Sequence, residues 1–269
     1  ELDNMDMVHL SNGALALDLC PDMGGAITRF SWRHPERGEI DLMRPMSKKS
    51  MAERDIEAAS AFVLTPFSNR VRDGKFTFGG KNIVMEQNAD GPHTEHGHGW
   101  QRPWHLESAG AQQALLRYEH KADSWPFGYL MEQRFSLSGE KLTINLETRN
   151  CCEQAMPYGF GFHPYFVRSA KCTLYADVSG FWQSDSEVMP TRHIAVPGAI
   201  DPKAGLAVGK HDLDNVFTGW NKRAEIIWPE QNASLAIKVD GPLGFLVVYA
   251  PPEKDYFCAE PVSNCTDAF

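Results

Sequence analysis

Apolar and polar residues alternate along most of the chain, and turn-forming residues interrupt the alternation at short intervals. Residues 14–19 place leucines on one side and small or polar residues on the other, which is the pattern of a half-buried strand. Residues 26–32 alternate in the same way, and the glycine-containing turn at 22–25 joins the two segments into a predicted hairpin. Further hairpins are predicted at residues 76–83, 106–121, 129–149 and 225–239.

Four stretches depart from this alternation. Residues 245–249 form a continuous apolar run, which predicts a strand buried on both faces. Residues 47–60 are short and mostly polar, and predict a surface loop or one short helix. Residues 88–105, rich in glycine and histidine, predict a loop, and residues 180–215, with scattered prolines, predict an irregular region. Because no long helix and no βαβ alternation appears, we expect an all-β sandwich or barrel.

Composition and charge narrow the class of protein. The 269 residues are 42% hydrophobic, enough for a large core, and all-β chains of this length are often single domains. The net charge of -9 argues against nucleic acid or an anionic membrane as the main partner. No apolar run approaches the roughly 18 residues of a membrane span, and the first residues lack the apolar segment of a signal peptide. The 6 cysteines show no CxxC spacing and are interpreted as reduced, so we expect a cytoplasmic protein.

One short stretch, residues 159–166, carries a histidine among aromatic residues. Pro164 has no backbone donor and favours an extended conformation for His163. Gly159 and Gly161 lack side chains, so another group can approach the backbone closely. These features are typical of an aromatic-walled slot for a sugar or another small molecule. The alternative is that His163 is a hydrogen-bonded residue of the core.

Glu260 is a second candidate for chemistry. It follows an apolar segment and precedes Pro261, at the predicted end of a core strand. A carboxylate at such a position is poorly solvated, which raises its pKa and makes it useful as a general base. The alternative is an ordinary strand-end glutamate that reaches solvent or pairs with an arginine.

Three histidines lie close together in the loop at residues 88–105, namely His93, His96 and His98. Imidazole is a good ligand for several transition metals, so a cupin-like metal site is one interpretation. A solvated polar loop is another, and a loop whose histidines hydrogen-bond a polyhydroxy ligand is the third. Arg70, next to Asn69, can donate to paired hydroxyl groups, and Asp214 can accept from them.

Together, these residues resemble the aldose 1-epimerase (galactose mutarotase) family. Four motifs in the family's order, which span most of the chain, carry the resemblance, and Asp214 before Phe217 fits a further family position. The motifs are residues 66–71 (PFSNRV), 96–100 (HGHGW), 161–166 (GFHPYF), and 260–264 (EPVSN) with 267–269 (DAF).

The resemblance implies a large antiparallel β-supersandwich over residues 1–269, with no metal and no cofactor. It implies interconversion of the α and β anomers of a free aldose of the galactose or glucose type. By position, Glu260 takes the proton of the C1 hydroxyl and protonated His163 gives a proton to the ring oxygen. The ring opens, the C1–C2 bond rotates, and the ring recloses on the other face of the aldehyde. Such chemistry needs one acid and one base, which we expect on opposite sides of the hemiacetal.

The resemblance also implies residues that bind the sugar. Asn69, Arg70, His96 and Asp214 are expected to hold sugar hydroxyl groups. Further candidate contacts are His98, Trp100 and Phe162.

The sequence departs from the family pattern in one motif, and other functions stay open. The family's His-Gly-Gly loop here has a second histidine, which we expect to alter sugar preference, and family members usually continue for a further strand beyond the last motif. One alternative is a hexose-6-phosphate 1-epimerase, whose phosphate would need a cationic clamp. Another is a non-catalytic sugar-binding protein on the same scaffold. The residues that could form the clamp are Arg70, Arg72, Lys75 and Arg102. The sequence indicates neither the preferred aldose nor the oligomeric state.

Overall fold

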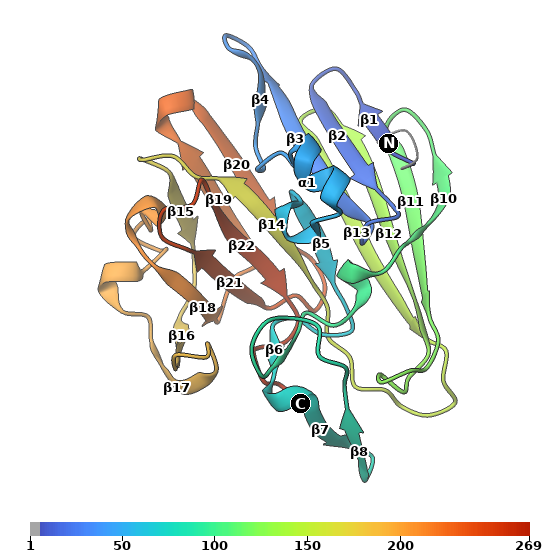
Figure 1. The fold of residues 1–269 in the computed structure, drawn as a ribbon. Coiled ribbons are helices and arrows are strands. Elements are labelled where there is room, and N and C mark those ends of the chain that lie inside the picture. Colours follow the sequence, from blue (N-terminus) through green and yellow to red (C-terminus); the bar gives the residue numbers. More distant parts are fainter. Residues whose placement is uncertain (1–5) are drawn as a thin grey trace.

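Antiparallel strands dominate the secondary structure of the computed structural model, which describes residues 6–269 (Figure 1). The largest sheet has eleven strands; ten follow the order β1-β2-β3-β5-β14-β22-β21-β18-β16-β17, and β4 pairs with β3. In chain order these strands are β1 (Val8–Ser11), β2 (Leu15–Cys20), β3 (Ala26–His34), β4 (Gly38–Asp41), β5 (Ala61–Leu64), β14 (Gly161–Val167), β16 (Gly180–Ser184), β17 (Pro190–Ala195), β18 (Leu213–Thr218), β21 (Phe245–Ala250) and β22 (Tyr256–Val262).

Two smaller sheets pack against the large one and share its core. In Figure 1 the β10–β13 sheet lies beside the β1–β3 end, and the β15-β19-β20 sheet lies toward the opposite end. Their strands are β10 (His105–Ala109), β11 (Gln113–His120), β12 (Tyr129–Ser138) and β13 (Lys141–Asn150), and β15 (Thr173–Ala176), β19 (Arg223–Trp228) and β20 (Ala233–Lys238). Two short pairs complete the strands: β6 (Arg70–Val71) with β9 (Thr94–Glu95), and β7 (Lys75–Phe78) with β8 (Lys81–Val84).

Helices are few and short. The α-helix α1 (Lys48–Glu53) begins at Ser47, whose hydroxyl accepts a hydrogen bond from the backbone of Ser50 and so satisfies one free donor of the first turn. The 3₁₀ segments are η1 (Ile56–Ala58), η2 (Arg72–Gly74), η3 (Gly99–Gln101), η4 (Gly198–Ile200), η5 (Val208–Lys210) and η6 (Pro229–Gln231). Within residues 6–269, no helix has the length and apolar character needed to cross a membrane.

The predicted all-β architecture is confirmed, and so are its hairpins. β2 pairs with β3, β7 with β8, β10 with β11, β12 with β13, and β19 with β20, all antiparallel. The short helix predicted within residues 47–60 is present. The continuous apolar run became β21, which has three consecutive buried residues because it lies between β22 and β18.

The prediction for residues 180–215 was wrong in its first half. β16 and β17 form a hairpin there, with Phe181 opposite Ile194. Pro190, read as a sign of irregular structure, is the first residue of β17. That strand is the last of its sheet, and a proline is tolerated at such an edge because the missing donor would face away from the sheet.

The central strands of the large sheet are buried on both faces, and each face meets a different cluster. On β5, Ala61 and Val63 belong to the main core, whereas Phe62 and Leu64 belong to a second, smaller apolar cluster. Alternation of side chains along a strand explains this separation. Tyr165 of β14 also lies in the second cluster. That cluster forms the floor on which the polar residues described below are placed.

Candidate active site

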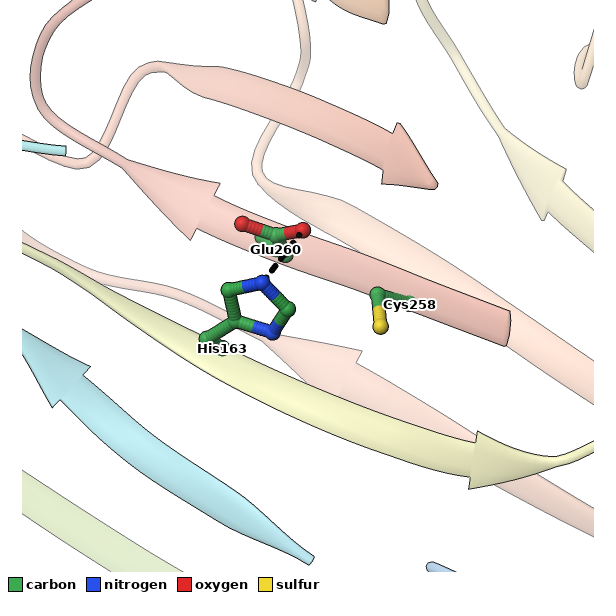
Figure 2. Close-up of side chains that lie close together, drawn as sticks. All are labelled: His163, Cys258 and Glu260. Atoms are coloured by element: carbon green, nitrogen blue, oxygen red, sulfur yellow. Dashed lines mark ion pairs between the residues drawn. The ribbon is translucent and has the colours of Figure 1, made fainter. Parts of the chain in front are cut away.

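The strand register brings His163 and Glu260 together. β14 and β22 are antiparallel neighbours in which Gly161 pairs with Val262, so His163 falls opposite Glu260. Side chains at opposed positions of adjacent strands lie on one face and contact one another. Figure 2 shows both side chains on that face, with His163 Nε2 3.4 Å from Glu260 Oε1. The two groups therefore lie side by side, and not facing each other across a gap.

Burial controls the charge of this pair. His163 is 5% exposed and Glu260 is 2% exposed, and removal from water disfavours a charged form. Burial lowers the pKa of His163 well below 6.5, and the neighbouring His96 and Arg44 lower it further. Burial also raises the pKa of Glu260 well above 4.5, and the nearby Asp214 adds to that effect. The free protein thus favours a neutral pair that carries one proton, on Glu260.

Two aromatic rings hold the imidazole of His163. Its centroid lies 4.8 Å from that of Phe62 and 4.6 Å from that of Tyr165, with interplanar angles of 34° and 22°. Nδ1 of His163 is buried, and no group in residues 6–269 hydrogen-bonds to it. The ring is therefore held by its stacking on Tyr165 and its contact with Phe62, with the Nε2 edge directed at Glu260.

A tight backbone exchange positions His96. The His96 N–H donates to the Asn69 carbonyl at 2.8 Å, and the Asn69 N–H donates to His96 Nδ1 at 3.0 Å. Both residues adopt a left-handed conformation, with φ near 60°, which is uncommon outside glycine. Gly97 follows with φ of 66°, and a Cβ there would lie 2.1 Å from the Thr65 carbonyl oxygen. Only glycine fits this close approach.

The hydrogen bonds fix the tautomer of His96. Burial, together with Arg70, lowers the pKa of His96 to about 3, so the ring is neutral near pH 7. Because Nδ1 accepts from Asn69, the ring proton sits on Nε2. The ring centroid lies 5.2 Å from that of His163, at 90°. His96 therefore offers a hydrogen-bond donor beside the His163–Glu260 pair.

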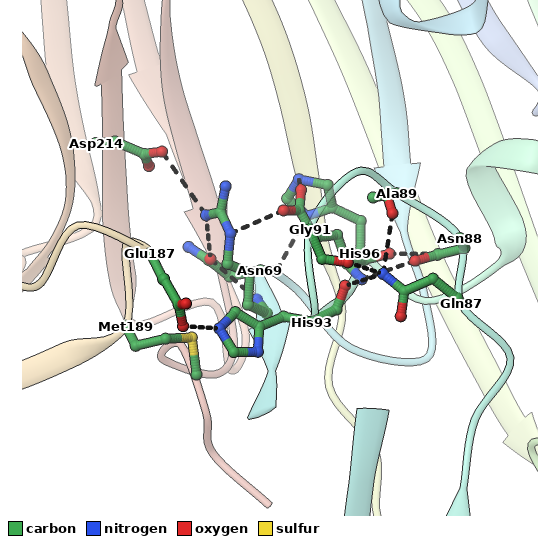
Figure 3. Close-up of polar contacts among 12 residues, drawn as sticks. Asn69, Gln87, Asn88, Ala89, Gly91, His93, His96, Glu187, Met189 and Asp214 are labelled. Atoms are coloured by element: carbon green, nitrogen blue, oxygen red, sulfur yellow. Dashed lines mark hydrogen bonds and ion pairs between the residues drawn. The ribbon is translucent and has the colours of Figure 1, made fainter. Parts of the chain in front are cut away.

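Carboxylates outnumber cations on the other side of the pair. Arg70 Nε lies 2.8 Å from Glu95 Oε1, and Arg70 Nη1 lies 3.7 Å from Asp214 Oδ2 (Figure 3). Burial raises the pKa of Asp214 to about 6 despite the nearby guanidinium, and burial also raises the pKa of Glu95. With Glu260, three carboxyl groups surround one arginine. These groups can accept hydrogen bonds from several hydroxyls while Arg70 donates to another.

Three of the candidate sugar contacts lie elsewhere in the structure. The imidazole of His98 stacks on His120, with centroids 4.1 Å apart, and its Nε2 is 2.8 Å from the Tyr129 hydroxyl. Phe162 lies on the opposite face of β14 from His163, packed against the main core. Trp100 is 3% exposed and stacks on Phe62, with centroids 5.1 Å apart. His98 and Phe162 point away from the pair, and Trp100 supports the floor beneath it.

Sequence reasoning missed the side chains that hold the histidine loop. Asn88 Nδ2 donates to the carbonyls of Glu95 and Gly97, both at 2.7 Å, and Asn88 Oδ1 accepts from the Glu95 N–H at 2.8 Å. Glu95 itself was missed as the partner of Arg70. Its place directly before His96 was the available signal, but a single loop position does not reveal the direction of its side chain.

The potential metal ligands that the structure brings together do not lie in the histidine loop. Within the described residues, only His163, Cys258 and Glu260 place three ligand-type atoms within 4.8 Å of one another. His93 instead pairs with Glu187, at 3.0 Å. Burial raises the pKa of the Cys258 thiol well above 9.0, whereas metal ligation requires the thiolate. The trio therefore suits proton transfer better than resident metal binding.

A close approach also explains the two glycines that flank the histidine strand. A Cβ on Gly159 would lie 2.1 Å from Asn264 Oδ1, and one on Gly161 would lie 2.7 Å from a side-chain carbon of Val262. The group that approaches these glycines is thus the C-terminal part of the same chain. This packing fixes β14 against β22 and with it the contact between His163 and Glu260.

Comparisons with known proteins agree with this fold. Residues 6–269 match the family model described as aldose 1-epimerase. The uncharacterised protein YphB of Escherichia coli K12 is 32% identical over 272 residues, covering 98% of this chain and 90% of that protein.

Solved structures give the same result. A crystal structure from Escherichia coli K12, described as a proposed aldose 1-epimerase, is 29% identical with a TM-score of 0.88, covering 98% of this chain and 90% of the other. A galactose mutarotase-like protein of Clostridium acetobutylicum has a TM-score of 0.85 at 19% identity, covering 99% and 87%. The expected mutarotase-like fold is confirmed.

Proposed function

The chain belongs to the aldose 1-epimerase family, and from that premise we propose that it interconverts the α and β anomers of a free aldose. The observation that carries the proposal is the buried contact between His163 and Glu260, 3.4 Å apart. Arg70, His96 and Asp214 surround this pair with one cationic donor, one neutral donor and one acceptor. His98 and Phe162 are not among the proposed sugar contacts, because they point away from the pair.

The side-by-side placement suits the chemistry better than the expected placement on opposite sides. The C1 hydroxyl oxygen and the ring oxygen of an aldose are both bonded to C1, so two neighbouring groups can reach both. Glu260 removes the hydroxyl proton while His163 protonates the ring oxygen, and the bond from C1 to the ring oxygen breaks. After rotation about C1–C2, the ring recloses with the two roles reversed.

This mechanism requires the proton on Glu260 to move to His163 before the ring opens. In the free protein burial favours the proton on Glu260, whereas the ring-opening step needs it on His163. The contact between Oε1 and Nε2 is the path by which the proton crosses once the sugar is bound. Glu260 is then an ionised base in a buried site, where it is strongly basic.

The charges of the site support a free sugar over a sugar phosphate. Three of the arginines that could have formed a phosphate clamp already pair with carboxylates: Arg70 with Glu95, Arg72 with Asp267, and Arg102 with Asp123. A phosphate would have to displace these carboxylates and would meet their repulsion. An uncharged hydroxyl group meets no such barrier.

Polarimetry tests the proposal. Freshly dissolved α-D-galactose and α-D-glucose are followed with and without the protein in a buffer that catalyses mutarotation weakly. We expect faster relaxation to the same final rotation, and the two rates rank the sugars. Acceleration confined to the 6-phosphates would replace the free-sugar assignment. Binding of sugars without acceleration of any would overturn the enzymatic proposal in favour of a binding protein.

A further inference from the structure

The aromatic packing around His163 continues to a partly buried cation, Arg44. Phe62 covers one side of the His163 ring and Tyr165 covers another. The guanidinium carbon of Arg44 lies 4.1 Å from the centroid of Tyr165 and 4.3 Å from that of Tyr256. Because His163 already covers one face of Tyr165, the guanidinium lies against the other face. Phe62 also contacts Tyr165 directly, with centroids 5.9 Å apart, and Tyr165 contacts Tyr256 at 5.1 Å, so the rings form a cluster in which Tyr165 lies between His163 and Arg44.

Arg44 is held in place by hydrogen bonds to residues 57–60 and to Tyr165. Its Nη2 donates to the carbonyls of Glu57 and Ala59 at 2.6 and 2.7 Å. Its backbone N–H donates to the Tyr165 carbonyl at 2.8 Å, and its own carbonyl accepts from the Ser60 hydroxyl at 2.6 Å. The Tyr165 N–H in turn donates to the Ser60 carbonyl at 2.9 Å. Backbone and side chain thus lock Arg44 onto Tyr165.

The stack supplies an orientation that hydrogen bonds do not. A catalytic histidine is usually oriented by a hydrogen bond to its second ring nitrogen. Nδ1 of His163 has no such partner among residues 6–269, so its stacking on Tyr165 and its contact with Phe62 carry the orientation. A cation held over an aromatic ring strengthens such packing when the site is desolvated.

We infer that Arg44 is a positioning residue for the His163–Glu260 pair, which pins Tyr165 and through it fixes the His163 ring with Nε2 toward Glu260. The inference rests on the proposed function of that pair. It assigns a role to a residue outside the four motifs and without contact to the sugar.

Arg44 also adds a fixed positive charge near His163. The titratable and charged groups that face His163 are Tyr165 from β14, Cys258 and Glu260 from β22, His96 from the segment after β9, and Arg44 from the segment after β4. Removing the charge of Arg44 should therefore raise the pKa of His163. A second proton then enters the pair at a higher pH, and the acid limb of the kcat profile moves to higher pH.

The test compares Arg44→Gln and Arg44→Lys with a matched control, Arg168→Gln. Arg168 also donates to backbone carbonyls, those of Pro251, Val208 and His211, but it lies over no ring of the described chain. Mutarotation of galactose is followed by polarimetry as a function of pH for each variant and for the wild type.

Arg44→Gln should lower kcat about 10-fold, because small misplacements of a catalytic group reduce rates strongly, and should change KM less than about 2-fold because Arg44 does not contact the sugar. Its acid limb should move to higher pH. Arg44→Lys should keep the acid limb in place but not the full rate, since an ammonium cannot lie flat on the ring while it holds two carbonyls. Wild-type kcat with an unmoved acid limb in Arg44→Gln would overturn the inference, and so would the same changes in Arg168→Gln.

A second measurement does not depend on turnover. The His163 ring packs against Phe62 and Tyr165, so the NMR signal of its Hε1 proton should be displaced by ring currents, and the His163→Asn variant identifies it. We expect Arg44→Gln to move this signal and Arg168→Gln to leave it. A signal that stays in place in Arg44→Gln rejects the positioning role even if no sugar is turned over. A wild type without mutarotase activity rejects only the proposed function.

Discussion

Two histidines on either side of Gly97 belong to two different regions of the molecule. His96 lies beside His163 in the candidate active site, whereas His98 lies in a polar network behind it. Both are neutral, because burial lowers the pKa of His96 to about 3 and that of His98 to about 2. A lowered pKa therefore does not distinguish the site from its support.

The two regions differ in how their hydrogen-bonding groups are used. Behind the site, hydroxyl groups form a chain from Thr148 through Tyr158 and Thr65 to Tyr129 and His98, with contacts of 2.6 to 3.3 Å. Thr65 donates to Tyr129, which leaves the Tyr129 hydroxyl hydrogen for His98 Nε2.

In the candidate active site, by contrast, polar groups remain available for further hydrogen bonds. His163 Nδ1 is buried without a hydrogen-bond partner in residues 6–269, and Arg70 pairs with Glu95 and Asp214, which leaves Glu260 without an arginine or lysine partner in the described chain. Buried polar groups are normally satisfied. An unsatisfied buried group together with an excess of carboxyl groups therefore marks the functional region better than burial or a perturbed pKa does.

The largest effect should come from the pair itself. Glu260→Gln keeps the shape of the side chain but removes the base, and we expect kcat to fall about 10³-fold. Sugar binding should persist, because the variant keeps the groups that hold hydroxyls. Polarimetry measures the rate, and calorimetric titration with galactose measures the binding. The matched control is Glu225→Gln, at an exposed strand position of β19, which should leave the rate unchanged. Substantial turnover in Glu260→Gln would exclude Glu260 as the base.

A substitution in the hydroxyl network behind the site should instead affect stability more than activity. His98→Leu leaves the Tyr129 hydroxyl without its partner and removes the stack on His120, so we expect a loss of about 3 kcal/mol in the free energy of unfolding. The value of kcat should change less than about 3-fold, since His98 does not face the pair. Urea unfolding and polarimetry on the same sample provide both values. A loss of activity comparable to that of Glu260→Gln would show that the two regions are one functional unit.

The fold was largely predictable because alternation and turn residues act locally. The hairpins β2–β3 and β12–β13 follow directly from patterns within twenty residues. β16 and β17 were not predicted, because Pro190 looks like an interruption until the edge position of β17 is known. Which sheet edge a strand occupies depends on distant segments, and local patterns do not contain that information.

The site was predictable in its residues but not in its geometry. The motifs indicated His163, Glu260, Arg70, His96 and Asp214, and these side chains lie close together. The direction of a loop side chain depends on backbone conformation and packing, so sequence alone could not separate His96 from His98. For the same reason the partners that surround the site, such as Glu95 and Tyr165, became visible only in the folded chain.

A third prediction concerns the pH dependence of stability that arises from Asp214. Burial raises the pKa of Asp214 from 3.8 to about 6, so the folded state binds this proton more tightly than the unfolded state. The corresponding stability is fully present below about pH 4 and is lost as pH rises through about 6. A difference of about 2 in pKa corresponds to about 3 kcal/mol, and partial exposure of the side chain reduces our expectation to about 2 kcal/mol.

Asp214→Asn removes this effect. Between pH 4.5 and pH 8, the free energy of unfolding of the variant should rise relative to that of the wild type by about 2 kcal/mol. Urea unfolding at several pH values measures the difference. Asp185→Asn is the control, because backbone hydrogen bonds lower the pKa of Asp185, so its difference from the wild type should stay nearly constant between pH 4.5 and pH 8. A difference between wild type and Asp214→Asn that does not depend on pH would contradict the proposed origin.

The smallest effect should come from Tyr158, which lies toward the other end of the hydroxyl chain from His98. Tyr158→Phe removes a hydroxyl that lies 2.8 Å from Thr65 Oγ1 and 2.6 Å from Thr148 Oγ1, and we expect a loss of about 1 kcal/mol in the free energy of unfolding. Tyr175→Phe, at an exposed position, is the control and should change nothing. The rate of mutarotation is the decisive measurement, because the Thr65 carbonyl accepts from the N–H groups of His98 and Gly99. If that backbone is rigid without the Tyr158 hydroxyl, kcat stays at the wild-type value; a fall in kcat would mean that the network sets the position of the histidine loop as well as the stability of the fold.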